Sequence, residues 1–153
     1  MSTISDARLK VRAIIEAATI LGSNGQPVNL AWPNEGEQLL ADPSVPVIHT
    51  DVLSDQAVFV EHGRGLGFNR YRNPGRIASF CFIEKNTGLD EAERLAMQIR
   101  DLLSSFDSVE LTTEIGTVFS AGEGSILAPT GLVMSGRYHW ASTEIPFYFD
   151  SIG

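Results

Sequence analysis

Three histidines and one cysteine are the side chains of this sequence best suited to bind a metal or to attack a substrate: His49, His62, His139 and Cys81. Zinc sites combine histidines one helical turn apart, or pair them with cysteines at short spacing. Neither arrangement occurs here, so we expect the histidines to lie on strands or at the rim of the fold. Cys81 falls within an apolar segment, where a thiol has a raised pKa and behaves as an inert hydrophobic side chain. These residues predict no metal site and no cysteine nucleophile.

A glycine repeat at Gly63, Gly65 and Gly67 has the spacing of a phosphate-binding loop. Such a loop needs a helix N-terminus directly behind it, where amide groups and the helix dipole meet the anion. Here the chain continues through Pro74 into an expected strand, so we interpret the repeat as a connection. The acidic residues within 90–93 are explained as a helix start, and no strand–serine–helix elbow is present. The sequence therefore predicts neither an enzyme nor a cofactor.

Arginines and aromatic residues concentrate in one segment of an otherwise acidic chain. Arginine and tyrosine are enriched at protein interfaces because they supply large contact areas. Residues 63–75 show no periodicity, and we expect them to form a loop that serves as an assembly surface. A solvated hairpin loop accounts for the same composition equally well, and contact with DNA is a third interpretation. The candidate interface residues, together with Trp32 at the end of an earlier strand, are Arg64, Phe68, Arg70, Tyr71, Arg72 and Arg76.

Two segments, 6–21 and 89–106, carry apolar residues at the spacing of amphipathic helices. In the first, Ser5 is expected to cap the N-terminus and Gly22 to end the helix. In the second, the apolar stripe is Ala92, Leu95, Ala96, Ile99, Leu102, Leu103 and Phe106.

Strands are expected at 27–31, 45–53, 57–62, 76–84, 109–119 and 132–150. Consecutive strands are joined by connections too short for a crossover helix, which favours antiparallel pairing. These patterns predict an α+β fold: a two-layer sandwich in which two helices cover one face of a mostly antiparallel sheet. The length corresponds to a single domain spanning 1–153. Cys81, Phe82 and the second helix are expected at the centre of the core.

The chain is acidic, with a formal net charge of −8. Tight non-specific binding to DNA depends on basic side chains that displace counterions, so this charge argues against it. Cys81 has no partner for an internal disulfide. The N-terminal residues lack the pattern of a secretion signal, and no apolar run is long enough to span a membrane. We therefore expect the protein to act in, or start from, the cytoplasm.

The order of segments resembles the tail-terminator proteins of long-tailed phages and related tail-like particles. The resemblance begins with Ala31-Trp32-Pro33-Asn34-Glu35, followed by the proline-led strand at 45–53. It continues through the glycine- and arginine-rich segment, the turn and helix from Thr87 to Phe106, and a closing strand at 145–150. The match is one of order and pattern over nearly the whole chain.

This resemblance implies a structural virion protein that forms a six-fold ring at the head-proximal end of a tail tube. The ring ends polymerisation of the tube and presents a surface to the neck or head-completion proteins. Its implied partners are copies of itself, the tail tube protein and those neck proteins, while DNA passes through the lumen without specific binding. The implied location is the virion, after assembly in the host cytoplasm. The resemblance carries over no catalytic residue.

Two other classes of protein remain open. One is a different phage neck or tail structural protein, such as a head-closure protein or a tube protein. The other is a small-molecule-binding or enzymatic α+β domain, which would have a pocket lined by His49 or His62.

Overall fold

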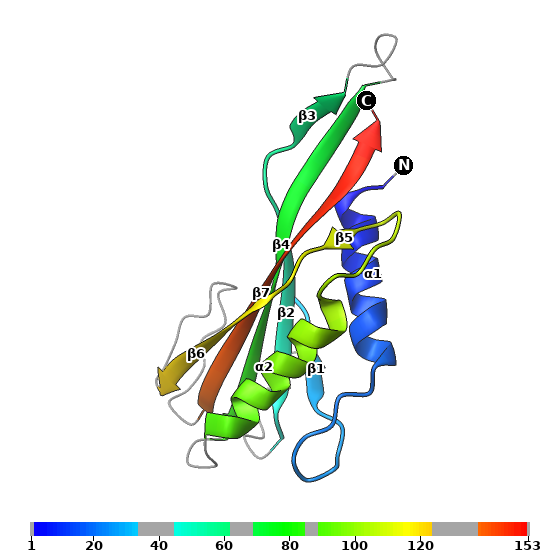
Figure 1. Ribbon diagram of the computed structural model, residues 1–153. Coiled ribbons are helices and arrows are strands. Elements are labelled where there is room, and N and C mark those ends of the chain that lie inside the picture. Colours follow the sequence, from blue (N-terminus) through cyan, green and yellow to red (C-terminus); the bar gives the residue numbers. More distant parts are fainter. Residues whose placement is uncertain (1, 34–44, 62–68, 85–88, 124–137, 153) are drawn as a thin grey trace.

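The computed structural model describes residues 2–33, 45–61, 69–84, 89–123 and 138–152 (Figure 1). Within these ranges the chain forms two helices and seven strands. In chain order they are α1 (Ile4–Ala17), β1 (Asn29–Ala31), β2 (Val47–Ser54), β3 (Val58–Glu61), β4 (Arg70–Glu84), α2 (Leu89–Leu103), β5 (Thr112–Thr113), β6 (Thr117–Glu123) and β7 (Tyr138–Ile152).

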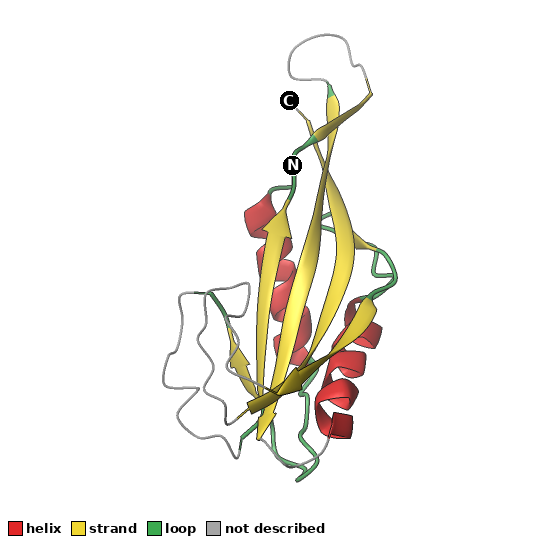
Figure 2. Cartoon of the chain, turned by 90° about the vertical axis from the view of Figure 1, so that its left-hand side faces the viewer, coloured by secondary structure: helices red, strands yellow, loops and turns green. Residues whose placement is uncertain are grey.

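All seven strands join one sheet, with the order β1-β2-β4-β7-β5. Strand β3 pairs with β4 beside β2, and β6 pairs with β7. Every pairing is antiparallel except that of β1 with β2, which is parallel. Both helices lie on the same face of the sheet (Figure 2). The predicted α+β fold, a two-layer sandwich with a mostly antiparallel sheet, is confirmed.

Helix α1 begins two residues earlier and ends four residues earlier than the sequence predicts. Thr3, not Ser5, caps it: the Thr3 hydroxyl accepts from the amide of Asp6, whose carboxylate accepts from the amide of Thr3. This capping box satisfies two amides that the first helical turn leaves without partners. At the other end Thr19 adopts a positive φ of 48°, and an isolated bridge pairs Leu21 with Pro27. A tight turn therefore replaces the last predicted helical turn.

Helix α2 covers the centre of the sheet with the predicted apolar stripe. Five side chains of that stripe are buried, and Leu102 and Phe106 pack partly against the same cluster. The helix ends three residues early at Leu103, because Ser105 takes a positive φ of 55° and redirects the chain. The buried residues of α2 are Ala92, Leu95, Ala96, Ile99 and Leu103.

The sheet is apolar on both faces at its centre. Cys81 points towards the helices and belongs to the main core. Phe82 points the other way, since successive residues of a strand face opposite sides, and packs with Val47 and Phe80 in a second cluster. The prediction that Phe82 forms the centre of one core together with Cys81 and the long helix is therefore wrong for Phe82.

In place of the predicted strand at 109–119 the chain forms two short strands, β5 and β6, with Glu114, Ile115 and Gly116 between them. Just before this break, the amide of Thr113 donates to the carbonyl oxygen of Phe106. This hydrogen bond holds β5 against the segment that follows α2. Strands β4 and β7 form the long central pair, which is in register over fifteen residues.

Candidate functional site

The far end of the central pair extends beyond the N-terminal end of α1 (Figures 1 and 2). We call this three-stranded end the arm and define it as β3 with residues 70–72 of β4 and 150–152 of β7. Within the arm, Val58 lies opposite Arg72 and Arg72 lies opposite Asp150. These paired residues share one face of the sheet, the face without helices.

Residues 70–75 form part of strand β4, so the prediction that this segment is a loop is wrong. The prediction followed the composition of Asn73-Pro74-Gly75, which is typical of turns. The carbonyl oxygen of Pro74 accepts from the amide of Asp55 (2.8 Å), so the ring nitrogen of Pro74 faces the same side, between β2 and β3. No ladder hydrogen bond is lost there, and the strand tolerates its proline.

Two arginines of the arm bind one carboxylate. Arg72 donates from Nε to Oδ1 of Asp150 (3.1 Å), and Arg70 donates from Nε to Oδ2 (3.0 Å). The guanidinium of Arg72 also lies 4.0 Å from the centre of the Tyr148 ring, within cation–π distance. Hydrogen bonds from Arg72, supported by Arg70, hold the pKa of Asp150 below its usual value despite partial burial. Two arginine side chains of β4 therefore share one carboxylate of β7 on this face of the arm.

Arg76 lies four residues beyond Arg72 along β4, and its Nη1 lies 3.8 Å from Oε1 of Glu144. Both side chains are about half exposed, and an ion pair of that kind contributes at most about 1 kcal/mol. The three described arginines of the predicted interface therefore each have a cross-strand carboxylate within the same molecule. Any contact of these arginines with a neighbouring subunit would be made in addition to these ion pairs.

The arm also exposes apolar side chains. Val58 is 56% exposed, Val60 is 44% exposed and Ile152 is 56% exposed. Among the described residues no strand pairs with the outer edge of β3. Proteins usually protect such an edge with charges, prolines or a covering element, because its free backbone groups pair readily with another chain. An apolar, unpaired edge is therefore a candidate assembly surface.

The structure brings some of the predicted interface residues together and separates others. Arg70, Tyr71 and Arg72 lie in the arm, whereas Trp32 follows β1, on the far side of β2. Trp32 is half-buried against the main core, and the guanidinium of Arg12 lies 5.1 Å from its ring centre. Arg64 and Phe68 lie outside the described residues.

Several residues of the arm were missed by the sequence analysis. The available signal was alternation of charge along two distant segments. Arg70, Arg72 and Arg76 alternate along β4, and Glu144 and Asp150 occupy one face of β7. Such complementarity becomes visible only once the pairing of the two segments is known. The missed residues are Val58, Val60, Asp150 and Ile152 of the arm, together with Glu144 and Tyr148 in the adjoining part of β7.

A polar hollow of about 360 Å³ lies beside the arm. Arg70 and Arg72 face Asp107 and Asp150 across it, so its formal charges balance. The hydroxyl of Thr112 donates to Asp107 at 2.9 Å, which orients that carboxylate within the protein. This balance favours neither an anion nor a cation as a ligand.

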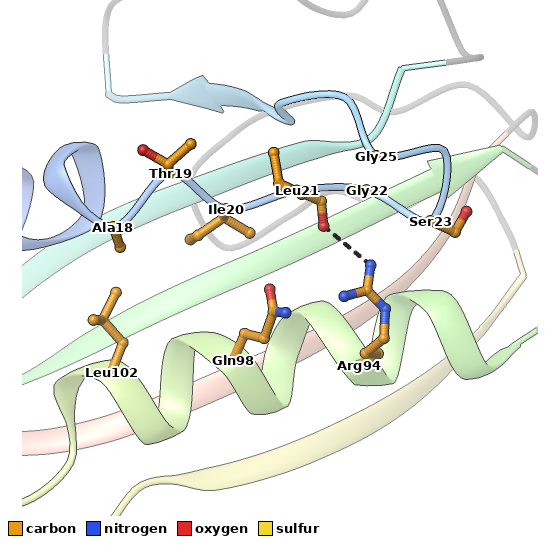
Figure 3. A pocket seen from close by; sticks show the side chains of 10 residues that line it. All are labelled: Ala18, Thr19, Ile20, Leu21, Gly22, Ser23, Gly25, Arg94, Gln98 and Leu102. Carbon is orange, nitrogen blue, oxygen red and sulfur yellow. Dashed lines mark hydrogen bonds between the residues drawn. The ribbon is translucent and has the colours of Figure 1, made fainter.

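A second hollow, of about 400 Å³, lies between α2 and the turn that follows α1 (Figure 3). Arg94 reaches from α2 and donates to the carbonyl oxygen of Leu21 (3.1 Å), while Glu91 accepts from the amide of Ser23 (2.9 Å). Arg94 and Glu91 also pair with each other at 2.8 Å, and this contact raises the pKa of Arg94. The charged groups at this hollow hold the turn against α2, and we assign them a structural role.

The other chemically capable side chains lie apart from these hollows. His49 is buried on the helix-free face, its Nδ1 has no hydrogen-bond partner, and burial lowers its pKa. Cys81 is fully buried, which raises the pKa of its thiol. His49 lines neither of these two hollows, and His62 lies outside the described residues. Within the described ranges no three histidine, cysteine or acidic side chains gather as a metal site would require.

Neither α1 nor α2 has the length and apolar character of a membrane-spanning helix. Comparison of the sequence with protein-family models and with curated proteins gives no match. Five chains of known structure match the fold. One of them, whose description states no function, superposes with a TM-score of 0.51 at 12% sequence identity, covering 93% of this chain and 95% of its own. At that identity the likeness concerns the fold alone.

Proposed function

We propose that this protein is a tail terminator of a phage or a related tail-like particle. In this role, copies of the chain form a ring, cap the head-proximal end of a tail tube, stop its polymerisation and connect it to the neck. The ring would be a homohexamer, as the resemblance in segment order implies. Its function would be structural, and it would need no cofactor.

The observation that carries the proposal is the arm, which extends past the helices and exposes an apolar edge. A ring is built when one surface of a subunit binds a different surface of the next subunit and the rotation closes. An edge strand with exposed valines suits such a contact, since a neighbour can cover it. Burying the exposed parts of Val58, Val60 and Ile152 would contribute roughly 1 kcal/mol each, repeated at every interface of the ring.

The same arm is compatible with a tube protein or a head-closure protein, and assembly behaviour separates these three functions. A tube protein polymerises by itself into long tubes. A terminator stops at a ring and halts the growth of tubes, whereas a head-closure protein does not halt it. No observation in the structure favours the small-molecule-binding alternative.

The test is electron microscopy and mass determination of the purified chain, alone and with the tube protein of the same particle. We expect closed rings that cap tubes. Val58→Lys places a charge on the edge of β3 and should remain a folded monomer, while Met97→Lys, a matched change on the exposed face of α2, should still form rings. Tubes that grow to unlimited length in the presence of the wild-type chain would overturn the proposal.

A further inference from the structure

The outer edge of β2 is open over its second half. Strand β1 pairs only with residues 47–49, and no described strand continues this pairing along residues 50–54. The amide of Asn29 donates to the carbonyl oxygen of Pro46 (2.9 Å), so the even-numbered residues of β2 direct their backbone groups to this side. Thr50 and Val52 therefore present amide and carbonyl groups to the open edge.

A groove of about 440 Å³ runs between this edge and α1. A groove of this size accommodates a short extended segment. The walls come from α1, from the two residues after β1 and from β2. Its lining residues are Ser5, Arg8, Leu9, Arg12, Trp32, Pro33, Thr50, Asp51 and Val52.

The groove combines an exposed cation with apolar surface. Arg8 donates from Nε to the carbonyl oxygen of Val52 (3.3 Å) and forms no ion pair with a described residue. Leu9, its neighbour on α1, is 64% exposed. Arg12 pairs with Glu16 (2.8 Å) and stacks over Trp32, which forms the end wall. Asp51 is the acidic side chain among the lining residues, so the wall formed by α1 is positive in a chain of strongly negative net charge.

We propose that this groove binds an extended, carboxylate-bearing peptide segment of another protein, which adds as a strand to residues 50–54 of β2. In this mode the backbone hydrogen bonds provide affinity, and alternate side chains provide specificity. The peptide would prolong the line of β1 along the open edge. The surface is distinct from the arm, and the proposal does not depend on the tail-terminator function.

The position of Arg8 explains why the segment should be acidic. In the free protein Arg8 satisfies the carbonyl of Val52, which is a backbone group of the open edge. An incoming peptide amide takes over that carbonyl and releases the guanidinium. A carboxylate on the α1 side of the peptide then accepts from the guanidinium, and this charge-assisted bond is stronger than the one it replaces.

The probes are two capped hexapeptides, one with alternating glutamate and valine and the other with lysine in place of each glutamate. Binding is followed by amide chemical-shift changes in the full chain labelled with ¹⁵N. We expect the glutamate peptide to shift the amides of Thr50 and Val52 and the indole of Trp32, with weaker binding at high salt. The lysine peptide should bind at least about tenfold more weakly, which corresponds to one charge-assisted hydrogen bond.

Two N-methylated versions of the glutamate peptide test the strand geometry. Each has methyl groups on alternate amides, so one set blocks the donors that face β2 and the other set blocks the donors that face away. Strand addition predicts that one version loses binding and the other retains it.

A matched pair of variants tests the role of Arg8. Arg8→Glu and Lys10→Glu change the net charge equally and both lie on α1, but only Arg8 lines the groove, whereas the half-buried Lys10 lies with its Nζ 5.6 Å from the centre of the Phe106 ring. We expect Arg8→Glu to weaken the glutamate peptide about tenfold or more and Lys10→Glu to leave its binding nearly unchanged.

Absence of shifts at Thr50 and Val52 with every peptide would overturn the proposal. Equal binding of the glutamate and lysine peptides, or equal effects of the two variants, would refute the acidic specificity. Concentration-dependent shifts of the same amides without peptide would assign the groove to a second copy of this chain and would also overturn it.

Discussion

Gly75 lies at the base of the arm, where β4 passes from its pairing with β2 to its pairing with β3. The residue is buried, and a Cβ atom added there would lie 2.3 Å from the carbonyl oxygen of Leu53 and 2.6 Å from Cζ of Phe147. Both distances are shorter than real carbon contacts, and the first involves backbone that moves only with the strand. Gly75→Ala should therefore strain the packing of β2 and β7 against β4.

The magnitude follows from two opposing effects. Overpacking of a filled core costs about 1–3 kcal/mol, and contact with backbone places this site near the upper end. Replacement of glycine by alanine in a strand returns roughly 0.5–1 kcal/mol through backbone entropy. We expect a net loss of about 2 kcal/mol in the free energy of unfolding.

The assay is urea denaturation followed by tryptophan fluorescence, with the slope against urea compared between variants so that a change in the unfolded state is recognised. A double-mutant cycle with Phe147→Leu supplies the control, because leucine lacks the ring atoms that the new Cβ would meet. Gly75→Ala should cost less in that background. A change below about 0.5 kcal/mol in the wild-type background would be typical of an unconstrained surface site and would refute the reasoning.

Two substitutions and one labelling experiment test the core and its buried groups. Ile99→Asp places an unpaired carboxylate under α2 and should cost more than about 4 kcal/mol or abolish folding, and a normal melting temperature would contradict the placement of the helix. Burial lowers the pKa of His49 below 6.5, against a smaller opposite effect of Asp51, so the unfolded chain takes up a proton that the folded chain resists. Stability should thus decline as the pH falls below 6.5, and His49→Gln should flatten this decline in urea titrations between about pH 7.5 and 5.5. Cys81, buried with a raised thiol pKa, should react with iodoacetamide only in denaturant, and rapid labelling of the native protein would show that the core opens.

The two helices and the fold class were predictable because their signals are local. The apolar stripe of α2 needs only a period of 3.6 residues, and its five core residues are buried as expected. The ends of the helices depend on single residues in unusual backbone conformations. Thr19 and Ser105 adopt positive φ angles, which sequence patterns rarely indicate for residues of these types.

The first part of β4 could not be predicted, and the reason differs from that for the helix ends. Its residues have the composition of a loop, but β7 offers a partner over the full length of the strand. Pairing across more than 60 residues of chain is a tertiary effect that overrides local preference. The parallel pairing of β1 with β2 has the same origin, since the long connection between them lets the chain return to the start of the sheet.

The residues of the predicted interface have partners within the molecule that their composition did not indicate. Counting arginines identified Arg70 and Arg72, but their cross-strand carboxylate, Asp150, lies 78 residues from Arg72 in sequence. From the sequence, these arginines were expected only to belong to a loop that serves as an assembly surface. In the structure they stiffen the arm first, so a neighbour would meet an organised surface whose side chains have already lost part of their conformational freedom.

The two surfaces proposed for binding lie on the same side of the central strand. Strand β7 occupies one edge of β4 along its whole length, and β3 and β2 share the other edge. The open edges of β3 and β2 therefore face the same direction, away from β7, and differ in chemistry. The edge of β3 exposes valines and suits an apolar partner surface that covers them and excludes water. The edge of β2 lies in a groove beside Arg8 and suits a single peptide strand with charged side chains. Because turn residues 55–57 separate the two edges, one extended partner segment cannot continue straight from one to the other as a regular strand. If both proposals hold, assembly through the arm and capture of a peptide in the groove would be separate events on this side of the sheet.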